Sequence, residues 1–538
     1  MPSTNNDITY FAETDFRGKK TKFGIKDIDR ARHFYVIGKS GVGKSTLLEN
    51  MAIQDIQNGH GVAFIDPHGS SADELLNYVP EQRIKDVIYF APFDLDHPIS
   101  FNIMEDVGRD GRHLVVGGLM SAFKKIWGEE SWSDRMAYIL TNILLALLEY
   151  PGSTLLGVNR MIADKEYRQK VVEHVTDPSV KAYWTDEFAK YTERFAAEAT
   201  PAVQNKIGQF TSNPLIRNII GQAKSSFDFR EIMDKKKIFI VNLSKGQLGE
   251  DNAKLIGAML ITKIYLAAMS RANVSAAVGG LPPFYVFVDE FQSFANESFA
   301  SILSEARKYK LALTLANQYV DQMSEEVRAA VFGNVGTTAA FRVGPLDAEL
   351  LEKLFSPTFT QEDLVNLDFA QIYLSLMIDG MGSTPFSART FPRFPQPARS
   401  FKKEIIEFSR QTYTKTREEV EKNIVIWHEA SRRRSAPAVL TRGSTLSPIK
   451  STVVKPQIPT NIISNHTNKV LSLKSLTPDL QPAKSTGKHT ADLKQILEQV
   501  RGSTLSAPKV ESRVPKPPEP KVEKTEVSEE VLKKMLEL

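Results

Sequence analysis

Residues 38–45 read GKSGVGKS, a pattern whose residue types and spacing could grip phosphate. It satisfies G-x-x-x-x-G-K-[ST] at every fixed position. The glycines let the backbone curl with its N–H groups pointing inward, Lys44 can reach the β- and γ-phosphates, and Ser45 can offer its hydroxyl to Mg²⁺. We therefore expect ATP and Mg²⁺ to bind here. The residues expected to bind the nucleotide are Gly38, Lys39, Ser40, Gly41, Val42, Gly43, Lys44, Ser45 and Thr46.

The surroundings of this loop favour phosphate binding over an ordinary glycine turn. The apolar run FYVI precedes it and a segment with helical character, TLLENMAI, follows it. A strand before the loop and a helix after it are the context that the motif requires, since the helix presents its positive end to the anion. The loop alone does not separate kinases, GTPases and motors.

A second acidic motif lies at the end of another apolar run, FYVFVDE. Asp289 can hold Mg²⁺, and Glu290 can polarise the attacking water. The alternative is a solvated strand end, where acids are common. The sequence has no Asn-Lys-x-Asp pattern that would read guanine, and a small-molecule kinase would rarely need so long a core. Together with the phosphate loop, the acids favour an ATPase.

Two further polar residues stand where a motor could use them. Gln318 ends the run LALTLANQ, where it could sense the γ-phosphate, and Arg307 in SEARKYKL could reach a neighbouring subunit's nucleotide. Taken alone, Gln318 could equally be a turn residue and Arg307 could pair with Glu305 or face solvent. Arg342 could be a charge at the rim of a sheet.

The elements that must position these residues alternate between strands and helices, which predicts an α/β fold. Several strands are continuous apolar runs, as expected for parallel strands covered on both faces. The interval 112–235 breaks the alternation with helical periodicity, and we expect an inserted all-helical domain there. The predicted strands are 34–37, 62–65, 87–90, 238–243, 284–288, 311–315, 338–343 and 371–378.

Composition excludes several kinds of protein. The 538 residues are 42% hydrophobic and 25% charged, with a net charge of only +4. Because there is no Cys, disulfides and thiolate metal sites are excluded. The first residues lack the basic and apolar regions of a signal peptide. The best candidate for a membrane span, 138–150, is too short and carries Thr, Asn and Glu, so we expect no transmembrane segment.

The C-terminal part differs from the rest. After Trp427 there is no Phe, Trp or Tyr, while Pro, Ser, Thr and Lys are frequent. Such a segment cannot bury enough apolar surface to offset the entropy of ordering, so we predict a basic, disordered tail over 432–538. A short helix is expected after Ser528. The phrase RGSTLS occurs at Arg442 and again at Arg501, either as a linear motif or as low-complexity drift.

Taken together, the motifs resemble a known family. FIDPHG at 64–69 is similar to the Asp-Pro-(His/Lys)-Gly motif of the HerA/FtsK superfamily of P-loop motors. With the phosphate loop, FVDEFQSFA, SEARKYKL and TLANQY, the sequence resembles the type IV secretion coupling ATPases, the TraD/TraG-like conjugative DNA transfer proteins. The resemblance covers roughly residues 10–400.

The resemblance implies a RecA-like core with an inserted helical domain. It implies a ring hexamer with nucleotide at the subunit interfaces and DNA at the central channel. It also implies catalytic roles for Lys44, Glu290, Gln318 as sensor and Arg307 as a finger acting in trans, and metal binding by Ser45 and Asp289. Asp66 and His68 would lie near the nucleotide, in roles that the resemblance leaves open.

These arguments divide the chain into an N-terminal strand segment, two parts of the motor that flank the insertion, a C-terminal helix and the tail. The expected boundaries are 1–33, 34–111, 112–235, 236–400, 401–431 and 432–538, in that order.

The function expected is an ATP-driven DNA translocase of conjugative transfer. Coupling proteins usually begin with transmembrane helices, whereas this sequence begins almost directly with the motor. We therefore expect a cytoplasmic protein that reaches the membrane through a type IV secretion or membrane-anchoring subunit. The alternatives are a protein-secretion ATPase, a soluble HerA-like translocase and a scaffold that binds ATP without hydrolysing it. Lys124 and Lys125 are candidate DNA contacts, although solvated surface lysines are the more common case.

Overall fold

The computed structural model describes residues 8–14, 19–105, 107–192, 194, 199–273, 280–295 and 297–435. The chain divides into two units between Thr441 and Arg442, so the described residues all belong to the first unit. Most of the predicted tail, the helix expected after Ser528 and both RGSTLS phrases lie outside the described residues. The first residues of the predicted tail, 432–435, are helical instead.

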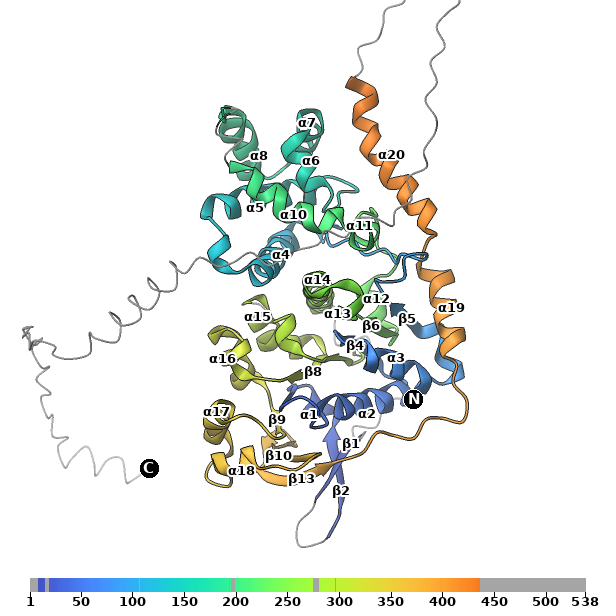
Figure 1. Cartoon of the computed structure of the whole chain (residues 1–538), viewed down its shortest axis with the longest axis vertical. Helices are drawn as coiled ribbons and strands as arrows, with labels where there is room; N and C mark the ends of the chain where they lie inside the picture. Colours follow the sequence, from blue (N-terminus) through green and yellow to red (C-terminus); the bar gives the residue numbers. More distant parts are fainter. Residues whose placement is uncertain are drawn as a thin grey trace, which may run out of the picture. The chain divides into compact units, whose positions relative to one another are not determined.

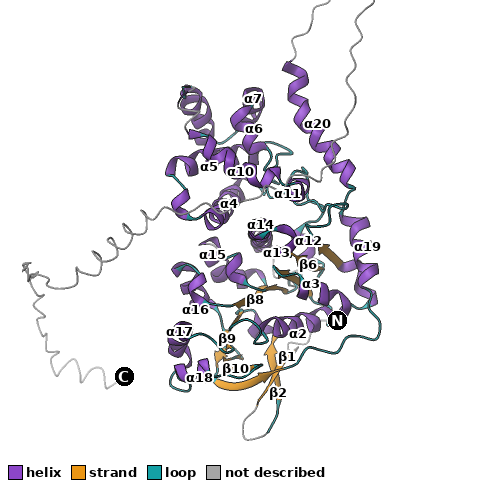
Figure 2. Cartoon of the chain, viewed as in Figure 1, coloured by secondary structure: helices purple, strands orange, loops and turns teal. Residues whose placement is uncertain are grey.

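An 11-stranded sheet lies at the centre of the described unit (Figures 1 and 2). Its order is β2-β1-β13-β10-β9-β3-β8-β7-β4-β6-β5. The strands from β9 to β5 are parallel to one another, and β10, β13, β1 and β2 continue the sheet antiparallel. The strands are β1 (Ile8–Thr14), β2 (Lys22–Lys26), β3 (Phe34–Ile37), β4 (Gly61–Asp66), β5 (Val87–Phe90), β6 (Ile238–Asn242), β7 (Phe284–Val288), β8 (Leu311–Asn317), β9 (Thr337–Ala340), β10 (Gln371–Ser375) and β13 (Phe386–Thr390), with β11 (Met377–Ile378) and β12 (Met381–Gly382) in a separate ribbon.

The predicted α/β fold is confirmed, and each predicted strand overlaps an observed one. The predictions 34–37, 87–90 and 284–288 match their strands residue for residue. Of the antiparallel strands, β10 lies within the predicted strand 371–378, β1 and β2 lie within the strand segment predicted for 1–33, and β13 was missed. These edge strands carry charged and polar residues in place of the continuous apolar runs of the parallel strands.

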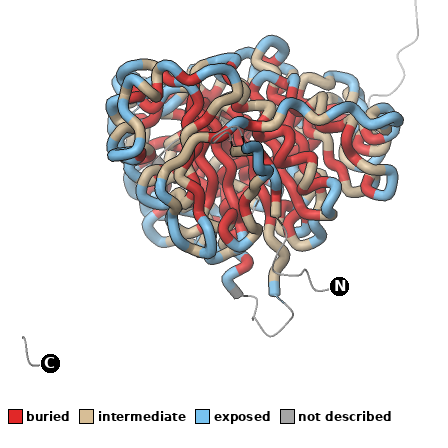
Figure 3. The backbone as a smooth tube through the Cα atoms, turned by 90° about the horizontal axis from the view of Figure 1, so that it is seen from below, coloured by how far each residue is buried: buried red, intermediate tan, exposed pale blue. Residues whose placement is uncertain are grey.

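Both faces of the parallel sheet are buried, which explains those apolar runs. In β3 the side chains alternate, so that Phe34 and Val36 join one core cluster while Tyr35 and Ile37 join the other. All four are at most 1% exposed. In Figure 3 the strands therefore form a continuous buried interior beneath exposed loops.

Helices cover the two faces. On one face, α2, α3 and α19 contribute to the cluster that contains Phe34, and on the other α14, α15, α16 and α17 contribute to the cluster that contains Tyr35. The helices are α1 (Asp27–Arg30), α2 (Lys44–Gln57), α3 (Ser70–Leu75), α4 (Arg112–Trp127), α5 (Asp134–Glu149), α6 (Gly157–Ala163), α7 (Lys165–His174), α8 (Pro178–Ala182), α10 (Pro201–Ser212), α11 (Pro214–Ile220), α12 (Phe229–Asp234), α13 (Lys245–Leu248), α14 (Glu250–Met269), α15 (Glu297–Glu305), α16 (Glu325–Asn334), α17 (Pro345–Phe355), α18 (Gln361–Val365), α19 (Lys402–Tyr413) and α20 (Arg417–Ser435).

Between β5 and β6 the described residues form helices α4 to α12 and no strand, where the sequence predicts the insertion. In Figure 1 these helices gather beyond one end of the sheet. The prediction that they fold as a separate domain stays a prediction, because residues 1–441 form one unit by their contacts.

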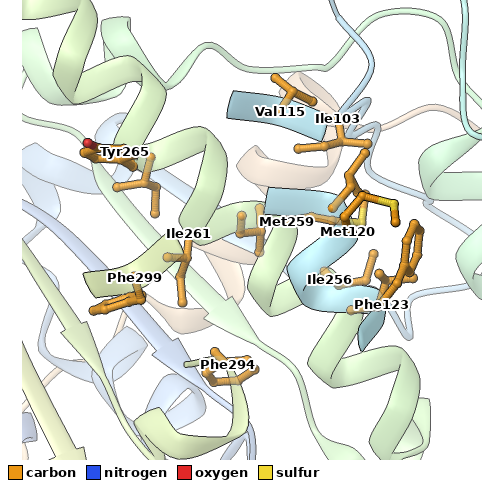
Figure 4. Close-up of a cluster of buried hydrophobic side chains, with 14 of the residues drawn as sticks. Ile103, Val115, Met120, Phe123, Ile256, Met259, Ile261, Tyr265, Phe294 and Phe299 are labelled. Atoms are coloured by element: carbon orange, nitrogen blue, oxygen red, sulfur yellow. The ribbon is translucent and has the colours of Figure 1, made fainter. Parts of the chain in front are cut away.

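Helix α14 is the element that joins this helical part to the sheet. Figure 4 shows its side chains Ile256, Met259 and Ile261 between residues of α4 and the rings of Phe294 and Phe299. Within the part of the chain that the structure describes, only the span Glu250–Ala272 is long and apolar enough to cross a membrane. Of the most apolar stretch of this span, 67% is buried inside the fold, as in a core helix that is apolar all round.

The structure divides the predicted C-terminal helix 401–431 into α19 and α20. Thr414 interrupts the helix with extended backbone and forms an isolated bridge to Ile99. Helix α19 packs beside β5, where Ser409 accepts a hydrogen bond from the backbone N–H of Tyr89. Helix α20 continues to the inserted helices, with Trp427 against Arg160. The two helices therefore connect the sheet edge to the helical part.

Candidate functional site

The phosphate loop connects β3 to α2 at the carboxyl edge of the parallel strands. Gly41 and Gly43 have φ angles of 75° and 117°, which an L side chain rarely adopts. At Gly38 an added Cβ would lie 2.6 Å from Cβ of Phe341, so only glycine fits. The loop therefore rests directly on the buried Phe341 ring that follows β9, and its glycines are a requirement of the geometry.

Neighbouring strand ends hold the loop from both sides. The end of β8, the end of β9 and the turn before β10 each exchange a backbone hydrogen bond with it. These bonds run from Gly38 N to Asn317 O (3.3 Å), from Lys39 N to Arg342 O (2.9 Å) and from Ala370 N to Val42 O (3.2 Å). The loop is therefore fixed in shape before any ligand binds.

Lys44 is buried, and its ammonium donates to two carbonyls of its own loop. Its Nζ donates to Gly38 O at 2.7 Å and to Lys39 O at 3.0 Å. Burial lowers the pKa of Lys44, although the nearby Glu290 and Asp289 act in the opposite direction. Because a buried ammonium is unfavourable without an anion, the site is suited to gain a negatively charged ligand.

Asp289 follows β7 and meets the phosphate loop. Its Oδ2 accepts a hydrogen bond from Ser45 Oγ at 2.7 Å, so the two predicted Mg²⁺ ligands are adjacent. Asp289 is 2% exposed. Burial, together with the neighbouring carboxylates of Asp66 and Glu290, raises the pKa of Asp289 to about 6 against the Ser45 hydrogen bond. A cation here would offset that cost, because it favours the charged carboxylate.

Glu290 has strained backbone, with a φ of 46°. Its N–H donates to Oδ1 of Asp289 at 2.9 Å, and its carboxylate accepts a hydrogen bond from Gln292. Non-glycine residues in the left-handed region are uncommon and gather at functional sites. The strain turns the chain sharply after β7, so that Asp289 and Glu290 stay together at the carboxyl edge near Lys44.

Asp66 and His68 differ in their surroundings. Asp66 is fully buried, and its carboxylate accepts hydrogen bonds from His68 N at 2.7 Å and Ala72 N at 3.0 Å. It therefore closes the turn after β4 and binds the first turn of α3. The side chain of His68 is exposed at the same edge. The structure thus gives Asp66 an architectural role that the sequence left open.

Gln318 directly follows β8, which pairs with β3. The side chain of Gln318 is half-buried. The residue before it, Asn317, was not among the residues predicted from the sequence. Asn317 is fully buried, donates to Tyr319 O at 3.0 Å and holds Gly38 through its carbonyl. An Asn immediately before a strand-end Gln was the available signal. Asn317 links the predicted sensor to the start of the phosphate loop.

Arg307 is not brought to this site. It lies exposed in a short turn, Ala306–Tyr309, just before β8 begins at Leu311. Because β8 is parallel to β3, its beginning lies at the amino edge of the sheet. The seven residues of β8 span roughly 23 Å at about 3.3 Å each. Arg307 therefore cannot reach the phosphate loop of its own chain.

Comparison with known proteins identifies a matching family. Residues 4–336 match the family model described as type IV secretory system conjugative DNA transfer. A type 4 coupling protein, DotL of Legionella pneumophila, is 20% identical over 393 residues, which is 62% of this chain and 50% of DotL. The chain therefore spans about half the length of this curated relative.

Solved structures share the fold. The plasmid coupling protein TrwB in complex with ADP and Mg²⁺ has a TM-score of 0.51 and 12% identity, covering 74% of this chain and 98% of TrwB. A trigonal form of TrwB with sulphate has a TM-score of 0.52 at the same identity and coverage. At this identity the likeness concerns the fold alone.

Proposed function

Because this chain belongs to the type IV secretory family of conjugative DNA transfer proteins, we propose that it is an ATP-driven DNA translocase. The observation that carries the proposal is the direct contact between Ser45 and Asp289 beside a preformed phosphate loop. The two side chains come from distant parts of the sequence and meet at the carboxyl edge, where open α/β sheets bind ligands. The translocase would deliver DNA during conjugative transfer.

The residues of the site fit ATP and Mg²⁺. The raised pKa of Asp289 and the buried Lys44 fit a site that receives a cation and an anion together. Mg²⁺, when bound, would neutralise charge on the phosphates. Ser45 and Asp289 would hold it, and Lys44 would bind the β- and γ-phosphates. The related TrwB was solved with ADP and Mg²⁺ and with an ATP analogue.

Glu290 would act as the base that polarises the attacking water, since it lies beside the metal ligand on a rigid turn. Gln318 would sense the γ-phosphate. The loop after Gln318 contacts the helical insertion, because Lys125 Nζ donates to Gln322 O at 3.2 Å. This contact gives a route by which the state of the nucleotide could bias the inserted helices.

Arg307 would act on the nucleotide of a neighbouring subunit. Its place at the amino edge leaves no route to its own phosphate loop, and an arginine finger supplied in trans is an established device of P-loop enzymes. This role requires a ring, and we propose a homohexamer. In such a ring, DNA would pass the central channel, where Lys124 is a candidate contact.

We place the protein in the cytoplasm, at the inner face of the membrane through a type IV secretion or anchoring subunit. Such a partner would present the DNA and its attached proteins to the ring. The predicted basic tail would contact phosphates with steep salt dependence or tether the ring to an acidic partner.

Steady-state ATP hydrolysis with and without single- or double-stranded DNA tests the proposal. We expect DNA to stimulate hydrolysis and Lys44→Ala to abolish it. Lys85→Ala, which removes an exposed lysine far from the phosphate loop, is the matched control and should behave as wild type. Hydrolysis that is stimulated by a secretion partner but not by DNA would instead indicate a protein-secretion ATPase. The absence of hydrolysis under all conditions would indicate a scaffold.

A further inference from the structure

A large apolar side chain, Phe369, lies exposed beside the phosphate loop. It is 64% exposed, and among the described residues no aromatic ring contacts it. Phe369 belongs to the turn before β10, and Gln371, the first residue of β10, pairs with Arg389 of β13. Burial of an exposed Phe by a ligand is favourable, so its position next to a ligand site calls for an occupant.

The turn that carries Phe369 is fixed against the loop. Ala370 N donates to Val42 O at 3.2 Å, and the Cα of Ala370 would lie 3.9 Å from a Cβ added at Gly43. On its other side, Ala370 O accepts a hydrogen bond from Thr390 N at 2.9 Å. Ala370 has a φ of 63°, an unfavourable conformation for a residue with a Cβ. The neighbouring contacts therefore hold Phe369 in a defined place.

The order of the strands gives the direction in which a nucleotide must lie. The sheet runs β7, β8, β3, β9, β10 across this edge. The metal ligand Asp289 follows β7 and Gln318 follows β8, so the γ-phosphate end must face that side of the phosphate loop. The nucleoside end must then leave on the opposite side of β3, toward β9 and β10. Phe369 is the exposed aromatic residue on that side.

We propose that Phe369 is the stacking platform for the purine base of the bound nucleotide. This inference rests on the proposed nucleotide site and adds to it a residue that fixes the base. An aromatic ring stacks on any purine, because every base has a π-face, so this contact favours adenine and guanine nucleotides alike. The phosphate loop binds the phosphates, and Phe369 contributes the part of the binding affinity that comes from the base.

The experiment separates base from phosphate. Dissociation constants of ATP and of inorganic tripolyphosphate are measured with Mg²⁺ for wild type, Phe369→Ala and Phe369→Trp. We expect Phe369→Ala to weaken ATP about tenfold, which corresponds to about 1.4 kcal/mol, and to leave tripolyphosphate unchanged. Phe369→Trp should restore ATP binding. Leu346→Ala is the matched control, since Leu346 is also exposed, at 70%, and follows β9 at the same edge.

The outcomes are distinguishable. If wild type binds neither ATP nor tripolyphosphate, the proposed function fails. If both bind and Phe369→Ala leaves their ratio unchanged, the stacking inference is overturned while the nucleotide site stands. A change of oligomeric state in Phe369→Ala at an unchanged ratio would also overturn it, because Phe369 would then be a subunit contact. A loss of ATP affinity alone, rescued by Trp, supports stacking.

Discussion

The two edges of the sheet treat buried charges in opposite ways. At the amino edge, Arg30 and Asp55 are at most 2% exposed and form two hydrogen bonds of 2.6 and 2.7 Å. Burial alone would raise the pKa of Asp55, but the charge and hydrogen bonds of Arg30 outweigh it, and the pKa is lowered. The guanidinium also lies 3.8 Å from the ring centre of Tyr285. Arg30 and Asp55 therefore satisfy one another.

At the carboxyl edge the neighbouring groups do not offset the cost of burying Lys44 and Asp289. The pKa of Lys44 is lowered and that of Asp289 is raised, so in both groups burial outweighs the neighbours that stabilise the charged form. The difference shows that burial alone does not mark a functional site. What marks it is a charge whose counter-charge must come from outside, together with a loop shaped to admit it.

The largest expected effect concerns Arg307, which in the proposed ring would connect the two edges of neighbouring subunits. Arg307→Ala should lower kcat about a thousandfold while ATP affinity is kept, because a finger stabilises only the transition state. Mixing Arg307→Ala subunits with Lys44→Ala subunits should recover activity about tenfold or more over either variant, since some interfaces regain both groups. Steady-state hydrolysis of the mixture measures this. A mixture no more active than the sum of its parts would contradict action in trans.

The next largest effect is expected when one residue of the Arg30–Asp55 ion pair at the amino edge is removed. Asp55→Ala leaves Arg30 buried without the carboxylate that accepts its two hydrogen bonds, so we expect the free energy of unfolding to fall by about 3–5 kcal/mol. Urea unfolding measures it. The double variant Arg30→Met/Asp55→Leu is the control and should recover most of the stability. A loss of under about 1 kcal/mol in the single variant would show that this edge is not held by its ion pair.

At the carboxyl edge, removing a buried carboxylate should stabilise the protein instead of destabilising it. Asp289→Asn removes a buried carboxylate whose pKa of about 6 lies above its ordinary 3.8. As pH rises from about 4 to 6, the unfolded chain loses this proton first, so wild type loses stability relative to the variant. We expect Asp289→Asn to be more stable by up to about 3 kcal/mol at pH 7, with a smaller gap at pH 5.

The same variant should lose the stabilisation that Mg²⁺ and ATP give to wild type, because a metal ligand is missing. Thermal unfolding with and without Mg²⁺ and ATP checks both effects. Lower stability at pH 7, or a gap that does not depend on pH, would contradict the contrast between the edges.

The smallest effect belongs to His33, a buried link at the amino edge. Its Nδ1 accepts from Leu313 N at 3.2 Å and its Nε2 contacts Leu303 O at 3.2 Å. Burial lowers the pKa of His33 to about 4, against the Leu303 hydrogen bond, and nearby Arg307 lowers it too. The unfolded chain therefore takes up this proton first as pH falls from about 6.5 to 4, and stability is lost in that window.

Urea unfolding of wild type and His33→Gln isolates this contribution from that of the carboxylates. The difference between the two proteins should shrink by about 2 kcal/mol from pH 7 to pH 5. A difference that stays constant over this range would show that His33 takes up its proton at the same pH in the folded and the unfolded protein, so that burial does not lower its pKa.

The sequence predicted what contiguous residues decide. The phosphate loop, the acids after β7 and the apolar strands are local patterns, and the structure has them where the sequence puts them. It could not predict the order of the strands, and with it which side of the loop faces Phe369, because pairing of distant strands is not local. An exposed Phe in a polar turn also looks like any other surface residue in the sequence.

Other roles depend on partners that no pattern reveals. Asp66 resembles an active-site acid in the sequence, yet its two oxygens are occupied by backbone N–H groups. Asn317 gains its importance only from the neighbouring phosphate loop. That Arg307 lies far from the nucleotide site of its own chain could be inferred only from the parallel pairing of β8 with β3.

The central claim is that ATP hydrolysis moves DNA, and displacement of a block from the DNA end tests it most directly. Streptavidin bound to end-biotinylated single-stranded and duplex DNA is the block, and its release is followed with Mg²⁺ and ATP. The account predicts release by wild type and none by Glu290→Gln, which should still bind ATP but lose roughly 10²–10⁴-fold in turnover. Hydrolysis by wild type without release, or equal release by Glu290→Gln, would contradict the claim.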